Sequence, residues 1–292
     1  MFIDIHVHVS RFVNQPKHGT RAFSSAEQLI ERYDAIDVEA GVLLPLVSPE
    51  VYLPQSNEDI LEVAKKYPTR FIPFCNIDPR SVSNASDAPL GKILDYYKQQ
   101  GCKGIGEVTA NLPLLDPMVQ NLFRHTERID FPLTFHIAHQ TTGVYGLYDD
   151  AGLPQLERSL ARFPNLKFFG HSQSFWAEIG TLRKIQDRAG YPSYPIDEEG
   201  AVPRLMRQYH NLYGDLSAGS GFKALNRDPA YAVNFLEEFQ DRLLFGTDIC
   251  APDTKTPLVD FLLGLRNDGS ISETVFQKVA RENAIRILNL NR

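Results

Sequence analysis

The first stretch of the chain shows the clearest alternation of apolar and polar side chains. Between residues 2 and 9 the aliphatic residues occupy every second position, and the polar residues between them are Asp4, His6 and His8. Alternation over this length predicts a β-strand with an apolar face and a polar face. We expect both imidazoles on the polar face, two residues apart, converging on one point just beyond the end of the strand.

Further along the chain, short apolar runs alternate with segments of helical periodicity. A capping box at Ser24 and Glu27 predicts the start of the first helix, and Gly41 predicts its end. We expect strands over residues 2–9, 41–47, 71–77, 104–108, 133–138, 166–171, 212–216 and 243–247. We expect further helices over residues 57–67, 90–100, 116–129, 153–163, 175–189, 229–239, 257–266 and 272–290. The segment 190–203 is rich in proline, glycine and acidic residues, which indicates an insertion loop.

Eight strands that alternate with helices predict an α/β fold, a closed (β/α)8 TIM barrel with a C-terminal helical extension. No break in composition divides the chain, so we expect a single domain over residues 1–292. The competing architecture is an open doubly wound sheet, which usually carries a glycine-rich turn after its first strand. Here the first glycine is Gly19, which favours the barrel.

Composition and charge narrow the class of protein. With 43 per cent apolar and 23 per cent charged residues, the chain resembles an ordinary globular protein. A net charge of −6 argues against a nucleic-acid or anionic membrane surface, and no apolar run is long enough to span a membrane. The absence of a basic and apolar leader, together with an odd number of widely spaced cysteines, predicts a cytoplasmic location.

Candidate chemistry gathers at the predicted ends of the strands. The first strand provides His6 and His8, and later strands provide Glu107, His136 with His139 close behind, His171 and Asp248. In a barrel the carboxyl ends of all strands meet at one mouth, so we expect these side chains to lie together. Imidazole and carboxylate groups suit zinc and its first-row neighbours.

Each of these residues also has a structural explanation when it is taken alone. Glu107 would pair with an arginine of a loop, His171 would be a hydrogen-bonded core histidine, and Asp248 would cap a short turn. The separate explanations would have to coincide at one end of the barrel. The joint pattern therefore favours a metal site.

Several motifs resemble the amidohydrolase superfamily, in particular its amidohydrolase-2 branch of metal-dependent hydrolases and decarboxylases. They are FIDIHVH, FHIAH, FFGHS and LLFGTD, with IDPR at residues 77–80 and ENAIRIL at residues 282–288. The resemblance implies that four residues bind one divalent ion, namely His6, His8, His136 and Asp248. It implies a catalytic role for His171, or a second metal bound by His171 and bridged by Glu107. We expect Zn²⁺, with one ion favoured over two.

The resemblance implies a hydrolase that cleaves an amide, ester or lactone bond with a metal-activated water, with Asp248 and His171 as catalytic residues. The alternative is a non-oxidative decarboxylase of a small aromatic or unsaturated acid, which needs cations around the substrate carboxylate. Three loop residues are candidates for that role, Arg11, Lys17 and Arg21, although scattered cations are usually solvated. A catalytically inactive metal-binding barrel ranks last, because no ligand of the set is missing.

Loops after the histidine-bearing strands are candidates for substrate contact. Together with Arg21, the candidates are His139, Tyr145 and Trp176, flanked by Tyr148 and Phe175. Aromatic walls with few polar groups suit a small organic molecule, but Phe175 and Trp176 would equally pack at the start of a helix. We expect a small-molecule substrate and no nucleic-acid or membrane partner. A homodimer is compatible with the sequence.

Overall fold

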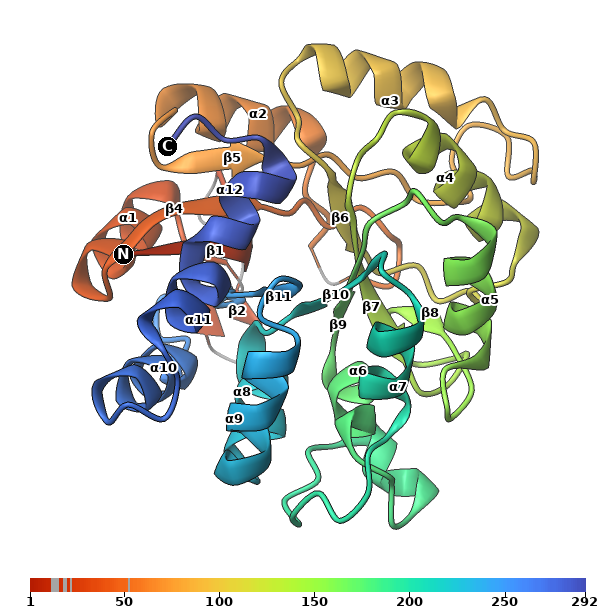
Figure 1. Ribbon diagram of the computed structural model, residues 1–292. Helices are drawn as coiled ribbons and strands as arrows, with labels where there is room; N and C mark the ends of the chain where they lie inside the picture. The colour runs from red at the N-terminus through yellow and green to blue at the C-terminus, as the bar shows by residue number, and fades with distance from the viewer. Residues whose placement is uncertain (12–15, 18–19, 22, 52) are drawn as a thin grey trace.

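The computed structural model describes residues 1–292 except 12–15, 18–19, 22 and 52 (Figure 1). Eight parallel strands form the barrel: β1 (Phe2–Val7), β4 (Val38–Leu43), β5 (Phe71–Pro73), β6 (Ile105–Val108), β7 (Leu133–Ala138), β9 (Phe168–His171), β10 (Leu212–Asp215) and β11 (Leu243–Leu244). They pair as β1-β4-β5 and as β6-β7-β9-β10-β11. Single parallel bridges, Cys75 to Ile105 and Val7 to Ile249, join the two sheets and close the ring. The predicted (β/α)8 fold is confirmed.

Helices surround the strands (Figure 1). They are α1 (Ala26–Ala35), α2 (Asn57–Lys66), α3 (Leu90–Gln99), α4 (Pro117–Arg128), α5 (Pro154–Arg162), α6 (Gln173–Trp176), α7 (Ala201–Gln208), α8 (Ala218–Asn226), α9 (Pro229–Glu238), α10 (Pro257–Asn267), α11 (Glu273–Gln277) and α12 (Asn283–Leu288). Short strands β2 (Pro16–Lys17) and β3 (Thr20–Arg21) form a hairpin, and β8 (Leu147–Tyr148) pairs with β7. Within the described residues, no helix is both long and apolar enough to cross a membrane.

Helix boundaries differ from the expectation where local capping decides them. Ser25, not Ser24, caps α1, and its capping box closes with Gln28 rather than Glu27. The apolar run predicted from residue 41 already begins as β4 at Val38, because α1 ends at Ala35. Strands β5 and β11 are much shorter than predicted, and α8 was not predicted.

The single helix predicted over residues 175–189 is wrong. The segment contains α6 and two short 3-10 turns, Ala177–Ile179 and Ile185–Ala189. The buried Arg188 donates to the Glu178 carboxylate, at 2.6 Å, and to the Asp149 carbonyl, also at 2.6 Å. These contacts hold Arg188 against Glu178 and Asp149, a position that one continuous helix over residues 175–189 would not give it.

The C-terminal extension closes one end of the barrel. Helix α12, blue in Figure 1, follows α11 through a π-helical turn, Lys278–Glu282. Its residues Ala284, Ile287 and Leu288 join the apolar cluster inside the barrel, which includes Ile3 near the start of β1. The opposite end of the barrel, where the strands terminate, is left for the site.

The first strand does not keep its predicted apolar face. Ile3 and Ile5 belong to the cluster inside the barrel, whereas Val7 and Val9 belong to the cluster between strands and helices. The pairing of β1 with β4 shifts register between Asp4 and Val7. An extra residue of this kind turns the following side chains to the other face of a strand. The four aliphatic residues are therefore divided between two faces.

This shift of register aims the histidines into the barrel. Asp4 lies on the outer side, where its Oδ2 accepts from the hydroxyl of Tyr33 on α1 at 2.7 Å. His6 lies inside, with its ring centroid 4.4 Å from that of His171 on β9. Without the shift, a strict alternation would place His6 on the same side as Asp4.

Candidate metal centre

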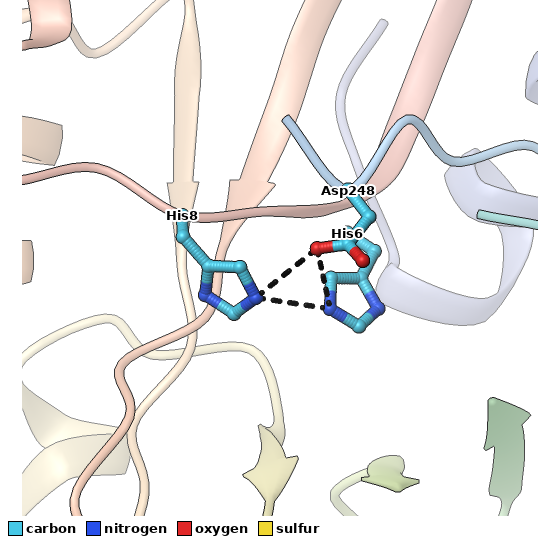
Figure 2. Close-up of side chains that lie close together, drawn as sticks. All are labelled: His6, His8 and Asp248. Carbon is cyan, nitrogen blue, oxygen red and sulfur yellow. Dashed lines mark hydrogen bonds and ion pairs between the residues drawn. The ribbon is translucent and has the colours of Figure 1, made fainter. Parts of the chain in front are cut away.

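Four side chains converge at the mouth of the barrel. His6 is on β1, His8 follows that strand, Glu107 is on β6 and Asp248 follows β11. His8 and Asp248 are 240 residues apart in the sequence, and the closed barrel brings them together. Figure 2 shows the two imidazoles and the Asp248 carboxylate pointing toward one another.

The distances among these four groups match a single coordination shell. His6 Nε2 lies 3.2 Å from His8 Nε2. Glu107 Oε2 lies 3.7 Å from His6 Nε2 and 3.6 Å from His8 Nε2. Asp248 Oδ1 lies 3.7 Å and 3.5 Å from the same two nitrogens. Ligands about 2.1 Å from a tetrahedral zinc ion are separated by roughly 3.4 Å, so the set fits a divalent ion at its centre.

Hydrogen bonds on the far side of each imidazole fix which nitrogen faces the centre. His6 Nδ1 lies 2.7 Å from Asp215 Oδ2, and His8 Nδ1 lies 2.8 Å from the Leu44 carbonyl oxygen. Both oxygens accept, so both Nδ1 atoms donate. In the neutral imidazoles the Nε2 atoms then carry lone pairs that face each other at 3.2 Å. Such an arrangement is unfavourable without a cation or a proton between them.

The pKa values of the clustered side chains show that the two carboxylates are stabilised by positive charge on the histidines. Burial lowers the pKa of His8, but the carboxylates of Asp248 and Glu107 outweigh burial and raise it to about 9. Burial raises the pKa of the Asp248 carboxyl, but His8 and His6 outweigh burial and lower it to about 2. Burial is likewise outweighed at Glu107, where His136, His6 and His8 hold the pKa well below its usual range. A divalent cation would satisfy the same carboxylates in place of protons.

His136 contacts this set through Glu107. Its Nδ1 lies 2.8 Å from Glu107 Oε1, on the oxygen that points away from His6 and His8. The structure therefore brings His136 to the site, hydrogen-bonded to Glu107. Glu107, His136 and His171 form a second buried group whose donor atoms lie within 4.8 Å of one another.

His171 lies beside the four-donor set. Its Nε2 is 3.9 Å from Asp248 Oδ2 and 3.9 Å from Glu107 Oε1. Its Nδ1 is 2.9 Å from the hydroxyl of Ser217, which precedes α8. Burial lowers its pKa, the nearby His6 lowers it further, and the resulting value is about 4. His171 is thus a neutral imidazole facing the second oxygen of Asp248.

Asp248 takes its position from backbone geometry. Its φ is 53°, in the left-handed region that few residues other than glycine, asparagine and aspartate adopt. Its amide donates to the carbonyl of His6, at 2.8 Å, so the chain end of β11 is tied to β1. The carboxylate then lies between the imidazoles of His6 and His8 on one side and the imidazole of His171 on the other.

Asp215 is the functional candidate that sequence reasoning missed. It is fully buried at the end of β10, and its Oδ2 lies 2.7 Å from His6 Nδ1 and 3.7 Å from His171 Nδ1. One signal could have found it. Glycine directly precedes a polar residue at the ends of three barrel strands, as Gly106-Glu107, Gly170-His171 and Gly214-Asp215.

A cavity of about 470 Å³ opens beside the metal centre, a volume that suits a small molecule. Its lining includes two residues predicted to contact substrate, His139 and Tyr145, together with the predicted metal ligand His136 and with Glu50. The Tyr145 ring centroid lies 4.6 Å from that of His136. Arg80 of the IDPR motif binds Glu50 through two bonds of 2.9 Å and 3.0 Å, so the motif braces the cavity wall.

Two other substrate candidates do not reach this cavity in the described structure. Trp176 is only 1 per cent exposed, and its indole N–H donates to the Asp215 carbonyl at 2.7 Å. Trp176 thus packs in the core with Phe175, as the structural explanation predicted, because a buried indole needs an acceptor. Arg11 pairs with Glu62 at 2.8 Å and Asp59 at 3.3 Å, both on α2, and is not among the residues that line the cavity.

Lys17 and Arg21 are the other two cations predicted from the sequence. Their backbones form part of β2 and β3, and their side chains are outside what the structure describes. The cavity lining that the structure describes contains no lysine or arginine.

The donor set fits a first-row divalent metal. It consists of imidazole nitrogens and carboxylate oxygens, which zinc and its neighbours accept. The Cys250 thiol lies 3.6 Å from Asp248 Oδ1, beside the set. The two Nε2 atoms 3.2 Å apart, with the Glu107 and Asp248 carboxylates beside them, provide the direct structural reason for a bound cation.

The family of the chain follows from comparison with known proteins. The family model described as Amidohydrolase matches residues 3–290. The chain therefore belongs to the amidohydrolase family of metal-dependent enzymes. No curated protein sequence is significantly similar to it.

Similar solved structures share the barrel at low sequence identity. An uncharacterised TIM-barrel protein from Bordetella bronchiseptica is 18% identical with a TM-score of 0.67, covering 99% of this chain and 98% of its own. The 5-carboxyvanillate decarboxylase from Sphingomonas paucimobilis is 17% identical with a TM-score of 0.64, covering 99% of both chains. A Pseudomonas putida protein assigned as a 2-pyrone-4,6-dicarboxylic acid hydrolase is 15% identical with a TM-score of 0.63, covering 100% and 98%. These likenesses support the fold.

Proposed function

We propose that this chain is a metal-dependent hydrolase that cleaves an amide, ester or lactone bond of a small organic substrate. The observation that carries the proposal is the position of Asp248. Its Oδ1 lies 3.5 Å from His8 Nε2 in the donor set, and its Oδ2 lies 3.9 Å from the neutral His171. One carboxylate thus stands between a cation site and a neutral imidazole.

The chain's own groups provide the proton transfers that hydrolysis needs. Asp248 is ionised at neutral pH, since its pKa is about 2, so it accepts the proton of the attacking water. The same group then returns that proton to the leaving group. His171, fixed by Ser217, lies where its Nε2 contacts the carboxylate or the substrate carbonyl oxygen. A bound divalent cation would supply Lewis acidity and lower the pKa of water toward about 7.

We propose Zn²⁺, and one ion rather than two. His6, His8, Glu107 and Asp248 would hold it, and Asp215 would orient His6 from behind. Glu107 Oε1 is already occupied by the hydrogen bond to His136 at 2.8 Å, which leaves Oε2 for the ion. A second ion at Glu107, His136 and His171 would have to break that bond.

Decarboxylation is the competing function, because structures similar to this chain include 5-carboxyvanillate and 2,6-dihydroxybenzoate decarboxylases. That reaction needs cations around the substrate carboxylate. The described cavity lining provides Glu50, whose charge is paired with Arg80, and neither lysine nor arginine, whereas Arg11 pairs with Asp59 and Glu62 of α2. A lining without a cation among the described residues favours an uncharged substrate. The cytoplasmic location and the homodimer stay predictions.

The deciding experiment combines metal analysis with a substrate screen. Lactones, esters and amides are assayed for hydrolysis, and hydroxybenzoate-type acids are assayed for release of carbon dioxide. We expect metal-dependent hydrolysis and about one zinc ion per chain. Replacing both His6 and His8 by alanine should remove metal and activity while the barrel stays folded, and His210→Ala, at an exposed histidine, should change neither. Carbon dioxide release without hydrolysis would establish the competing function.

A further inference from the structure

Asp4 is a fully buried carboxylate on β1 that the proposed reaction does not use. Its Oδ1 accepts the backbone amides of His6, at 3.0 Å, and of Thr247, at 2.9 Å. Its Oδ2 accepts the hydroxyls of Tyr33, at 2.7 Å, and of Thr247. A carboxylate has about four lone-pair sites, so these four donors fill both oxygens. Asp4 thereby joins β1 to the segment that follows β11.

The hydroxyl of Thr247 has a defined direction. Thr247 is buried, and its Oγ1 accepts the backbone amide of Ile249 at 3.2 Å. The proton of the hydroxyl is then free to be donated to Asp4 Oδ2. The hydrogen bonds thus run in one direction, from Ile249 through Thr247 to Asp4.

This chain of hydrogen bonds surrounds Asp248. It binds both neighbours of Asp248 in the sequence, Thr247 and Ile249. Asp248 itself has a φ of 53°, a backbone conformation that persists where the surrounding structure holds it. Its amide donates to the carbonyl of His6 at 2.8 Å, and the amide of His6 donates to Asp4. The carboxylate that faces the two imidazoles in Figure 2 is therefore held through both of its neighbours.

We propose that Asp4 and Thr247 are positioning residues that act as a pair to hold Asp248 at the candidate metal centre. Both act through the backbone, because Asp4 binds the amides of His6 and Thr247, and Thr247 binds the amide of Ile249. The inference rests on the proposed function, in which Asp248 binds the ion and accepts the proton of water. A displacement of about 1 Å is enough to cost an enzyme roughly 100-fold in rate. Loss of the pair therefore weakens zinc binding and slows the reaction.

The test removes the hydroxyl of Thr247 while the size of the side chain is kept. Thr247→Val leaves Asp4 Oδ2 with one donor fewer and the Ile249 amide without its acceptor. Competition with a chelator measures zinc affinity on the full chain and requires no turnover. We expect the zinc dissociation constant to rise about tenfold, the lower end of the range for loss of a group that orients a ligand. At saturating zinc, kcat should fall about tenfold while KM changes less than about twofold, since the cavity lining is untouched.

Two further variants separate positioning from a purely structural role. Thr247→Ser keeps the hydroxyl, so it should keep zinc affinity and kcat within about twofold of wild type. Thr126→Val is the matched control, because it removes the hydroxyl of another fully buried threonine, which donates to the Leu122 carbonyl within α4 at 2.8 Å. Thermal unfolding should show a loss of stability in both valine variants. Zinc affinity and kcat should fall in Thr247→Val alone.

Asp4→Asn reaches the same hydrogen bond from β1, and it keeps the inference testable if Thr247→Val does not fold. It replaces one accepting oxygen by a donating amide, so zinc affinity should again fall about tenfold. In the double variant the loss should be smaller than the product of the two single losses, because both changes break one bond.

Three outcomes would overturn the inference: wild-type zinc affinity in either single variant, a double variant that shows the full product of both losses, or a raised KM with an unchanged kcat in Thr247→Val. A chain that hydrolyses nothing in the substrate screen, yet loses zinc affinity in Thr247→Val and not in Thr126→Val, would contradict the proposed hydrolysis alone.

Discussion

His6 Nδ1 donates to Asp215 Oδ2 at 2.7 Å, and this bond decides which nitrogen of His6 faces the candidate metal centre. Both residues are fully buried, one on β1 and the other at the end of β10. Burial raises the pKa of Asp215, but the neighbouring His6 outweighs it, so the carboxyl stays ionised and keeps accepting. Partners of this kind orient metal-binding histidines and increase their basicity.

The first prediction concerns this pair. Asp215→Asn should weaken zinc binding about tenfold, since loss of such a partner typically costs a factor of roughly 10–100 in affinity. Competition with a chelator measures the constant. Asp149→Asn, at a buried aspartate that accepts backbone amides at the start of α5, is the matched control and should leave zinc affinity unchanged. Equal zinc affinity in Asp215→Asn and wild type would show that the bond does not orient His6.

The second prediction concerns Trp176. Trp176→Phe leaves the Asp215 carbonyl without its donor and opens space in the core. We expect the free energy of unfolding to fall by about 2–4 kcal/mol. Denaturant unfolding measures it. A Trp176→Phe variant with wild-type stability and an altered KM would show instead that Trp176 contacts the substrate.

The third prediction concerns the close approach of a loop to His136. Gly146 has a φ of 110°, and a Cβ there would lie 2.8 Å from His136 Cδ2. Gly146→Ala should therefore displace the His136 ring, lower hydrolytic activity and cost stability. Gly152→Ala is the control, because its φ of 88° carries the backbone strain while no atom lies within 4 Å of the added methyl.

Thermal unfolding and kcat/KM of both glycine variants are compared. Backbone strain of this kind costs about 1–3 kcal/mol and should appear in both. The activity loss should appear only in Gly146→Ala. Equal activity in the two variants would contradict the assigned contact between Gly146 and His136.

The fourth prediction concerns pH and lies far from the metal centre. Burial raises the pKa of Glu39, but Arg292 and Arg281 outweigh it, so the folded value lies below the usual 4.5. A depressed pKa contributes stability that is present above pH 4.5 and is lost as the pH falls below it. Glu39→Gln should cost about 1 kcal/mol at pH 7, and the cost should shrink below pH 4.5.

The pH dependence is measured by urea unfolding of wild type and variant between pH 7 and pH 3.5. Glu31→Gln is the matched control, since Glu31 is exposed and has no ion pair among the described residues. A cost of Glu39→Gln that stays constant down to pH 3.5 would contradict the assigned ion pairs.

The sequence by itself predicted the architecture, which the structure confirms, and grouped most of the side chains of the candidate metal centre. Barrel strands are buried on both faces, so each appears as a short apolar run, and helices pack one face, so each repeats with a period near 3.6 residues. Residues at strand ends share one mouth by topology. His6, His8, Glu107, His171 and Asp248 could thus be grouped before any coordinates were known.

Tertiary structure decided what local pattern cannot encode. The register shift in β1 arises from pairing with β4, so strict alternation gave the wrong faces for Val7 and Val9. Asp215 contacts His6, which is 209 residues away in the sequence. The buried indole of Trp176 donates to the Asp215 carbonyl. Each outcome depends on partners distant in the chain, whose positions only the closed barrel determines.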